Sequence, residues 1–251
     1  MTIVRRQRDV LRVTGPDAQT YLQGQLSQDV DALGVGDAAE TFVLQPTGKV
    51  EAWMRVSRMA DDVFMLDVDA GWGMVVVARL TRFLLRTDCT VEPVDWDLVT
   101  VLDAEMGSVD APPGGLALPV TWPGLQAVDL LGPSVDLPKG PTNGDGSMWE
   151  HRRIAAGIPM MGAEMDETTI PGATGVVDRS ASFTKGCYTG QELVARVDSR
   201  SAGTPTRIVR ATGQGPLPSA ETEITLDGVV AGRLTSVATR PGTGPTDGFV
   251  A

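Results

Sequence analysis

The chain has 251 residues and a formal net charge of −11, from 21 Lys and Arg against 32 Asp and Glu. A hydrophobic fraction of 42% with 21% charged residues is typical of a globular chain and excludes a disordered one. The acidic balance argues against broad nucleic-acid binding, because phosphate neutralisation requires a surplus of Lys and Arg. Two Cys and one His cannot supply the thiolates of an iron–sulfur cluster or a usual structural zinc site, so we expect no bound metal or cluster.

No export or membrane signal is visible in the sequence. Three arginines near the N-terminus are not followed by an apolar run of signal-peptide length. The longest apolar stretch, within residues 72–85, is interrupted by two arginines and is too short for a membrane span. We therefore expect a cytoplasmic protein without a membrane partner, in which Cys89 and Cys187 are free thiols.

In the N-terminal part of the chain, the spacing of apolar residues alternates between the period of strands and that of helices. Strands are predicted over residues 10–13, 41–44, 50–56 and 63–68, and helices after Pro16 and over residues 72–86. Residues 50–56 alternate strictly, so Val50, Ala52, Met54 and Val56 are expected on one buried face. This alternation is typical of antiparallel sheets and indicates an α+β fold, not a doubly wound one.

One helix carries a basic stripe. Arg79, Arg82 and Arg86 recur at helical spacing within residues 72–86. They could cradle an anion, but a solvated face near a helix C-terminus is the favoured interpretation. No glycine-rich phosphate loop follows any predicted strand, so a dinucleotide or nucleoside triphosphate site is unsupported.

A connector rich in Pro, Gly and Asp covers residues 132–146. Ser147 and Glu150 then fit a capping box, which predicts a helix that ends near Ala156, before Gly157. His151 on this helix is expected to be a surface or capping group.

The C-terminal part reads as strands and turns. A hairpin is predicted around Asp227-Gly228, a favoured two-residue turn. We predict mixed or antiparallel sheets and helices over residues 1–202, followed by a small all-β, barrel-like domain over residues 203–251.

Residues 185–192, which read K-G-C-Y-T-G-Q-E, form the densest cluster of reactive and turn-forming side chains. Gly186 and Gly190 bracket Cys187 and permit close backbone approach. A short helix is predicted from Gln191, so Cys187 would lie near a helix N-terminus with Lys185 two residues away. Both features stabilise a thiolate, the form of cysteine that acts as a nucleophile or metal ligand.

The same segment carries groups that suit a planar ligand. Tyr188 offers an aromatic ring, and Gln191 and Glu192 offer paired hydrogen-bond donors and acceptors. Alternatively, Cys187 is a small buried side chain and the glycines only shape a turn. Spacing alone leaves both interpretations open, whereas Cys89, in an apolar context, is expected to belong to the core.

This segment resembles the signature of the YgfZ-type folate-binding proteins, relatives of the glycine-cleavage T-protein. Other similar segments, which together span nearly the whole chain, are residues 21–30, 46–50, 153–159, 166–171 and 227–236. The resemblance implies a folate-binding α+β body with a C-terminal β-barrel. It also implies tetrahydrofolate, or a one-carbon derivative, as cofactor.

The resemblance further implies a role in assembling or repairing iron–sulfur proteins, including those that modify tRNA. Partners would then be folate and iron–sulfur assembly factors or client proteins, and the oligomeric state is left open. Tetrahydrofolate would lie in a central cleft with Cys187 at its edge, where the thiolate would handle a one-carbon unit, a sulfur species or a transient iron contact. Lys185 would support the thiolate, and Tyr188 would pack near the ring. Asp29 and Arg196 are weaker candidates for cofactor binding.

The chain departs from the T-protein pattern at one position that matters for catalysis. T-proteins carry an acidic pair after the turn at residues 46–50, where this chain has Ala52 and Trp53. Glu51 is adjacent, but an alternating strand would point it to the opposite face from Ala52. This difference argues against aminomethyl transfer. The chain also ends at Ala251, earlier than the family's usual last strands, so we expect a shorter barrel.

Three functions remain as hypotheses. The first is a tetrahydrofolate-binding accessory protein for iron–sulfur chemistry. The second is a folate-dependent one-carbon transferase or demethylase, and the third is a non-catalytic folate-binding scaffold. A thiol-redox protein is disfavoured because the chain has no C-x-x-C pair.

Overall fold

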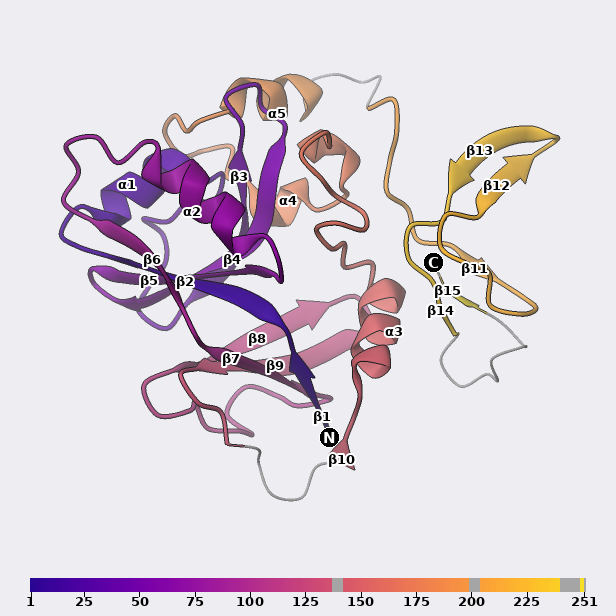
Figure 1. The fold of residues 1–251 in the computed structure, drawn as a ribbon, viewed down its shortest axis with the longest axis horizontal. Coiled ribbons are helices and arrows are strands. Elements are labelled where there is room, and N and C mark those ends of the chain that lie inside the picture. Colours follow the sequence, from indigo (N-terminus) through magenta and orange to yellow (C-terminus); the bar gives the residue numbers. More distant parts are fainter. Residues whose placement is uncertain (137–141, 199–203, 240–248, 251) are drawn as a thin grey trace.

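The computed structural model describes residues 1–136, 142–198, 204–239 and 249–250, with the side chains of residues 195–198 and 249–250 excepted. Two five-stranded sheets and a few short helices form the body, and a small group of strands follows at the C-terminal end (Figure 1). This is the predicted α+β fold. Within the described residues, no helix is long and apolar enough to cross a membrane.

The first sheet is antiparallel and supports two helices. Its strands, in spatial order, are β3 (Ala38–Leu44), β4 (Val50–Ala60), β5 (Val63–Asp69), β2 (Arg8–Thr14) and β6 (Thr90–Val94). Helices α1 (Ala18–Gln25) and α2 (Gly73–Thr81) pack on one face, where Leu22 and Leu80 enter a buried core. Burial of these apolar faces supplies the main driving force for this half of the fold.

The second sheet packs against the other face of the first. Its strands are β10 (Thr142–Asn143), β1 (Thr2–Arg6), β7 (Asp97–Leu102), β9 (Leu125–Gly132) and β8 (Leu116–Trp122). Only the β1–β10 pair is parallel. Because Gln7 alone separates β1 from β2, one extended segment passes directly from the second sheet into the first. A further core between the sheets includes Val4, Phe42 and Leu102.

The strands predicted over residues 10–13, 41–44, 50–56 and 63–68 are confirmed, each within a somewhat longer strand. The helix predicted over residues 72–86 is wrong at its C-terminal end, since α2 stops at Thr81. Arg86 adopts a φ of 59°, a left-handed conformation that a helix cannot continue through.

The predicted alternation along β4 is correct only after residue 51. The β3–β4 register shifts between Val43 and Leu44, so Val43 pairs with Ala52 but Leu44 pairs with Val50. Glu51 is the extra residue of this β-bulge. Val50 consequently shares the core of Trp53 between the sheets, while Ala52, Met54 and Val56 face the helices. Both faces are buried, so the strand is not half-buried as predicted.

Helix α3 (Gly146–Ala156) starts earlier than the capping box predicted. Asp145 is the N-cap, and its carboxylate accepts a hydrogen bond from the backbone N–H of Met148. Ser147 instead donates to Asp145 at 2.5 Å. The predicted stop is confirmed, because Gly157 ends the helix in the left-handed conformation. The connector predicted over residues 132–146 contains β10 and residues 137–141, which lie outside the described part of the chain.

Short helical elements join α3 to the C-terminal strands. They are η1 (Pro171–Ala173), α4 (Val177–Ser180) and α5 (Gln191–Asp198), the last beginning where the sequence predicted. A three-stranded sheet contains β11 (Thr212–Gly213), β15 (Phe249–Val250) and β14 (Ala238–Thr239). The predicted boundary between residues 202 and 203 lies outside the described residues.

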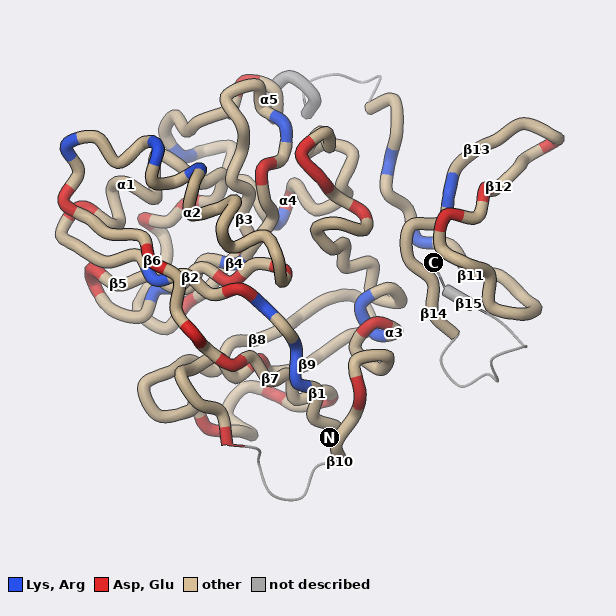
Figure 2. The backbone as a smooth tube through the Cα atoms, in the orientation of Figure 1, with Lys and Arg blue, Asp and Glu red and all other residues tan. Residues whose placement is uncertain are grey.

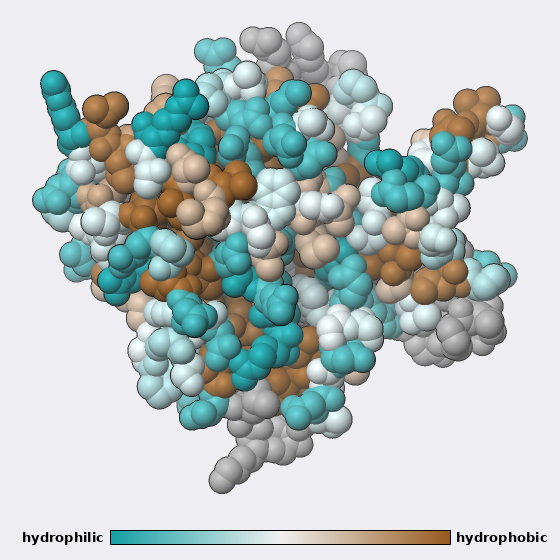
Figure 3. All heavy atoms as spheres, in the orientation of Figure 1, coloured by the Kyte–Doolittle hydropathy of each residue, from teal (hydrophilic) through white to brown (hydrophobic). Residues whose placement is uncertain are grey.

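The predicted hairpin is confirmed as β12 (Glu223–Leu226) and β13 (Val229–Arg233). Asp227 and Gly228 have φ values of 52° and 80°, as a two-residue hairpin turn with two positive φ angles requires. The hairpin extends away from the body, and apolar side chains such as Leu226 and Val229 are exposed on it (Figures 1 and 3).

Candidate functional site

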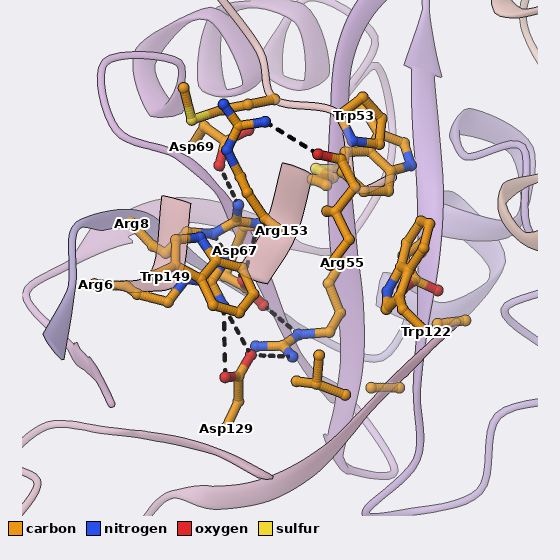
Figure 4. A pocket seen from close by; sticks show the side chains of 18 of the residues that line it. Arg6, Arg8, Trp53, Arg55, Asp67, Asp69, Trp122, Asp129, Trp149 and Arg153 are labelled. Atoms are coloured by element: carbon orange, nitrogen blue, oxygen red, sulfur yellow. Dashed lines mark hydrogen bonds and ion pairs between the residues drawn. The ribbon is translucent and has the colours of Figure 1, made fainter. Parts of the chain in front are cut away.

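A cavity lies between the two sheets and α3 (Figure 4). Its lining includes three tryptophans, four arginines and four carboxylates: Trp53, Trp122, Trp149, Arg6, Arg8, Arg55, Arg153, Glu40, Asp67, Asp69 and Asp129. These side chains come from both sheets and from α3, so only the tertiary fold brings them together. We call this space the central cavity.

Arg55 on β4 is the centre of a buried ion-pair network. Its guanidinium lies 2.8 Å from carboxylate oxygens of both Asp67 on β5 and Asp129 on β9. Each of these two carboxylate side chains is 2% exposed. Arg55 therefore connects the first sheet to the second across the edge of the cavity.

The N-terminal segment completes the network where it changes sheets. Arg8 pairs with Asp67 at 3.0 Å and also contacts Asp69, while Arg6 lies 3.3 Å from Asp129. Burial alone would raise the pKa of Asp67, but attraction from Arg55 and Arg8 outweighs burial and holds the pKa below its ordinary value. Asp67 is thus held as an anion by the surrounding guanidinium groups.

Aromatic rings and guanidinium groups stack along the cavity wall. The Arg6 guanidinium lies 3.7 Å from the centre of the Trp149 ring, and the Arg179 guanidinium lies 3.6 Å from that of Trp122. Trp53 meets Trp122 edge-on with the ring centres 6.2 Å apart. Such surfaces bind flat, polar ring systems well, because stacking and cation–π attraction act together.

All four carboxylates that line the cavity are paired with arginine. Asp67, Asp69 and Asp129 belong to the network above, and Glu40 lies 3.1 Å from Arg179. For Asp67, attraction from Arg55 and Arg8 lowers the pKa, so this carboxylate is a poor proton acceptor. Glu51, the bulged residue, does not line the cavity.

Sequence reasoning missed most of the residues that line this cavity. Trp53 was noted as a departure from a T-protein position, Met54 as a buried strand residue and Arg153 as part of a similar segment, but none was predicted to line a cavity. The sequence did contain a signal for the charged part of the cavity. Asp67 lies within the apolar run of residues 63–68, and Asp69 follows directly after it. A buried charge is costly, so such a position indicates a specific partner or a function.

The motif loop, residues 185–192, lies apart from the central cavity, which none of its residues lines. Cys187, Tyr188, Gly190, Gln191 and Glu192 instead line a separate surface hollow with the 46–48 turn. Cys187 is exposed, and α5 begins four residues after it. The placement of Cys187 at the edge of the central cleft is therefore not what the structure shows.

Two glycines explain how the motif loop packs on the turn at residues 46–50. Gly190 and Gly48 both have a φ of +83°, and an added Cβ on Gly190 would lie 2.7 Å from the carbonyl oxygen of Gln45. An added Cβ on Gly48 would lie 2.3 Å from Cβ of Leu193. Two sequence motifs more than 130 residues apart thus meet by close backbone contact.

Lys185 and Tyr188 are both turned inward. The Lys185 ammonium donates to the backbone carbonyls of Gln23, Leu26 and Gln28 at 2.6, 2.8 and 2.8 Å. Tyr188 is 7% exposed and belongs to the core between the sheets. Burial raises the pKa of Tyr188 to about 12, so its ring carries a neutral hydroxyl at neutral pH.

The weaker candidates have structural contacts. Asp29 accepts a hydrogen bond from Gln23 at 2.8 Å and does not line the cavity. The Arg196 side chain lies outside the described part of the structure. Cys89 is half-buried at the margin of the core beside α2, and burial raises its pKa. His151 is half-buried on α3, where burial lowers its pKa.

The basic stripe on α2 is divided by the fold. Arg79 is buried, and its guanidinium donates to the carbonyl of Leu44 and to the Gln25 side chain. Arg82 and Arg86 are exposed. The solvated face is thus confirmed for Arg82 and Arg86. Arg79 instead donates hydrogen bonds to the end of β3, the strand that leads into the 46–50 turn.

Two other segments that resemble the family, residues 153–159 and 227–236, meet at α3. The Arg153 guanidinium donates to the Ser236 hydroxyl at 2.7 Å, and Ser236 in turn contacts Glu164. This buried contact attaches the C-terminal strands to the body.

Among the described residues, no three His, Cys, Asp or Glu side chains gather as metal ligands would. Acidic and basic residues are interspersed along the chain (Figure 2).

Comparison with known proteins places this fold. No protein-family model matches the chain. Aminomethyltransferase T of the glycine cleavage system from Bartonella henselae superposes with a TM-score of 0.80 at 15% identity, covering 99% of this chain and 77% of that one. The protein therefore has the aminomethyltransferase T fold.

Sequence relatives narrow the assignment. An uncharacterised protein of Haemophilus influenzae is 31% identical over 198 residues, which cover 78% of this chain and 68% of that protein. Proteins named tRNA-modifying protein YgfZ from Klebsiella pneumoniae and Cronobacter sakazakii are 29% and 27% identical, each over 76% of this chain. Together with the structural match, these relatives show a YgfZ-type, T-protein-like fold. The chain spans 65% and 64% of the length of these two YgfZ relatives.

Because of the ion-pair network, the free energy of unfolding should depend on pH in the acidic range. Because the folded-state pKa of Asp67 lies below its unfolded value near 3.8, the contribution is complete above that pH and is lost as the pH falls through the folded-state pKa. We expect Asp67→Asn to lower the free energy of unfolding at pH 7 by about 3–5 kcal/mol and to flatten its decline in acid. Urea unfolding between pH 7 and 3 measures both, with the 95% exposed Asp61 changed to Asn as control. An unchanged acid limb in Asp67→Asn would contradict this role.

The close packing at Gly190 predicts that the two glycines of the motif loop differ in how much stability an alanine substitution costs. We expect Gly190→Ala to lower the free energy of unfolding by about 2 kcal/mol or more, because φ is positive and backbone atoms block the methyl group. Gly186→Ala is the matched control, since no atom lies within 4 Å of its added Cβ. Urea unfolding compares them, and equal destabilisation would show that the close packing is unimportant.

Proposed function

We propose that the protein binds a reduced folate in the central cavity and serves as an accessory protein for iron–sulfur-dependent chemistry, including tRNA modification. The single observation that carries this proposal is the cavity wall, where three indole rings and four guanidinium groups surround one space. The aminomethyltransferase T fold and relatives named tRNA-modifying protein support it.

The chemistry of the wall matches that of tetrahydrofolate. A reduced folate combines a polar bicyclic ring, an aryl group and an anionic glutamate. Trp122 and Trp149 present indole surfaces for the rings, each already stacked with a guanidinium. The cavity arginines are already paired with carboxylates, so they offer N–H donors to the polar ring and little net positive charge.

Cys187 serves a different step in this proposal. Its thiol is exposed in a hollow that shares no lining residue with the cavity. A partner protein therefore reaches Cys187 from solvent while folate occupies the cavity. Iron–sulfur assembly factors or client proteins in the cytoplasm are the proposed partners, and Gln191 and Glu192 lie beside the thiol in the same hollow.

The paired carboxylates weigh against the alternative of a one-carbon transferase. Aminomethyl transfer requires a group that accepts a proton, and Glu40, Asp67, Asp69 and Asp129 are each held by arginine. We therefore favour binding of folate without turnover. This leaves the motif loop as the place of chemistry.

Tetrahydrofolate binding can be tested through the tryptophans. We expect tetrahydrofolate to quench fluorescence of the wild-type protein, and Trp149→Ala to weaken binding about tenfold through lost stacking. Trp96→Phe is the control, because Trp96 does not line the cavity. Calorimetric titration provides an independent measurement. If neither method detects binding to the wild-type protein, the folate proposal fails.

Cys187 can be separated from folate binding. We expect Cys187→Ala to bind tetrahydrofolate as the wild type does, because the thiol lies outside the cavity. The same variant should fail to restore the activity of an iron–sulfur tRNA-modifying enzyme in cells that lack the family protein. Cys89→Ser is the matched thiol control. Full complementation by Cys187→Ala at normal protein level would instead favour a scaffold without thiol chemistry.

A further inference from the structure

Lys185 occupies a cage made by the backbone. Its ammonium donates to three carbonyl oxygens, those of Gln23, Leu26 and Gln28, at 2.6–2.8 Å. An ammonium has three N–H bonds to donate, so the three carbonyls use its full capacity. On another side, the Tyr188 ring centre lies 5.1 Å from the nitrogen.

The carbonyls of this cage belong to the end of α1 and the segment after it. The last turn of a helix leaves carbonyl oxygens without intrahelical partners, and a cation there also meets the negative end of the helix dipole. Lys185 supplies that cation from a segment 157–162 residues away. The backbone N–H of Thr189 then donates to the Gly24 carbonyl at 3.2 Å, which adds a second tie between the same two segments.

We propose that Lys185 is a positioning residue, whose ammonium fastens the Cys187 loop to the end of α1 instead of supporting the thiolate by its charge. This replaces the electrostatic role expected from the spacing of the two residues. The inference goes beyond the proposed function, since it concerns the placement of the loop and needs no folate for its test.

The titration of Lys185 agrees with this position. Burial lowers the pKa of Lys185 to about 8, whereas Asp29 and Asp31 act to raise it. The ammonium is therefore the main form at pH 7. A neutral, isosteric side chain at this position would leave three carbonyls without a donor.

The first measurement compares wild type with Lys185→Met in a Cys89→Ser background. Positioning predicts that the Thr189 amide exchanges hydrogen about tenfold faster in the variant, because the cage no longer holds the loop. It also predicts that the ratio of Cys187 reaction rates with anionic and cationic methanethiosulfonates stays the same. A changed ratio with unchanged exchange would overturn the proposal in favour of electrostatic support.

Chemical rescue provides a second, independent measurement. In Lys185→Ala, ethylammonium should enter the cage and restore slow exchange of the Thr189 amide. Tetramethylammonium at the same ionic strength should not, because it has no N–H to donate. Equal effects of the two ions, or no effect of ethylammonium on a folded Lys185→Ala protein, would refute the cage. If Lys185→Met fails to fold, Lys185→Ala purified with ethylammonium still decides the question.

Discussion

The bridge from Arg55 to Asp67 and Asp129 is the interaction on which the rest of the structure depends. It crosses from β4 and β5 in one sheet to β9 in the other, with both distances 2.8 Å and both carboxylates buried. Removing one of these charges would leave the remaining buried charges out of balance, which is strongly destabilising even though Arg6 and Arg8 still contact the carboxylates. The two sheets are therefore held in one orientation, and the central cavity keeps its shape.

The same network determines what the cavity can do. Its carboxylates are paired with arginines, and Trp122 and Trp149 lie in its wall, each stacked with a guanidinium. The fold is shared with aminomethyltransferase T, and in the proposed function this cavity binds folate without transfer. In the proposed function, chemistry is left to Cys187, in a hollow on the outside of the body.

The motif loop is held from two directions. Gly190 packs on the 46–50 turn, and Lys185 reaches the end of α1. Segments that resemble the same family in sequence are therefore neighbours in space, and part of their pattern reflects packing. A glycine is needed where backbones touch, and a lysine where a helix ends without partners for its carbonyls.

Local patterns in the sequence predicted four strands of the first sheet, the hairpin turn at Asp227-Gly228 and the start of α5, because hydrophobic period and turn chemistry act over a few residues. They did not predict the strands of the second sheet. They failed at Glu51, where a bulge reversed the faces of the strand, and at Asp145, which caps α3 in place of Ser147. The motif loop was recognised from sequence, but its separation from the cavity was not. Only the tertiary structure decided that separation and the choice of Arg6, Arg55 and Asp129 as cavity residues, since burial and charge pairing between distant strands leave no periodic mark along the chain.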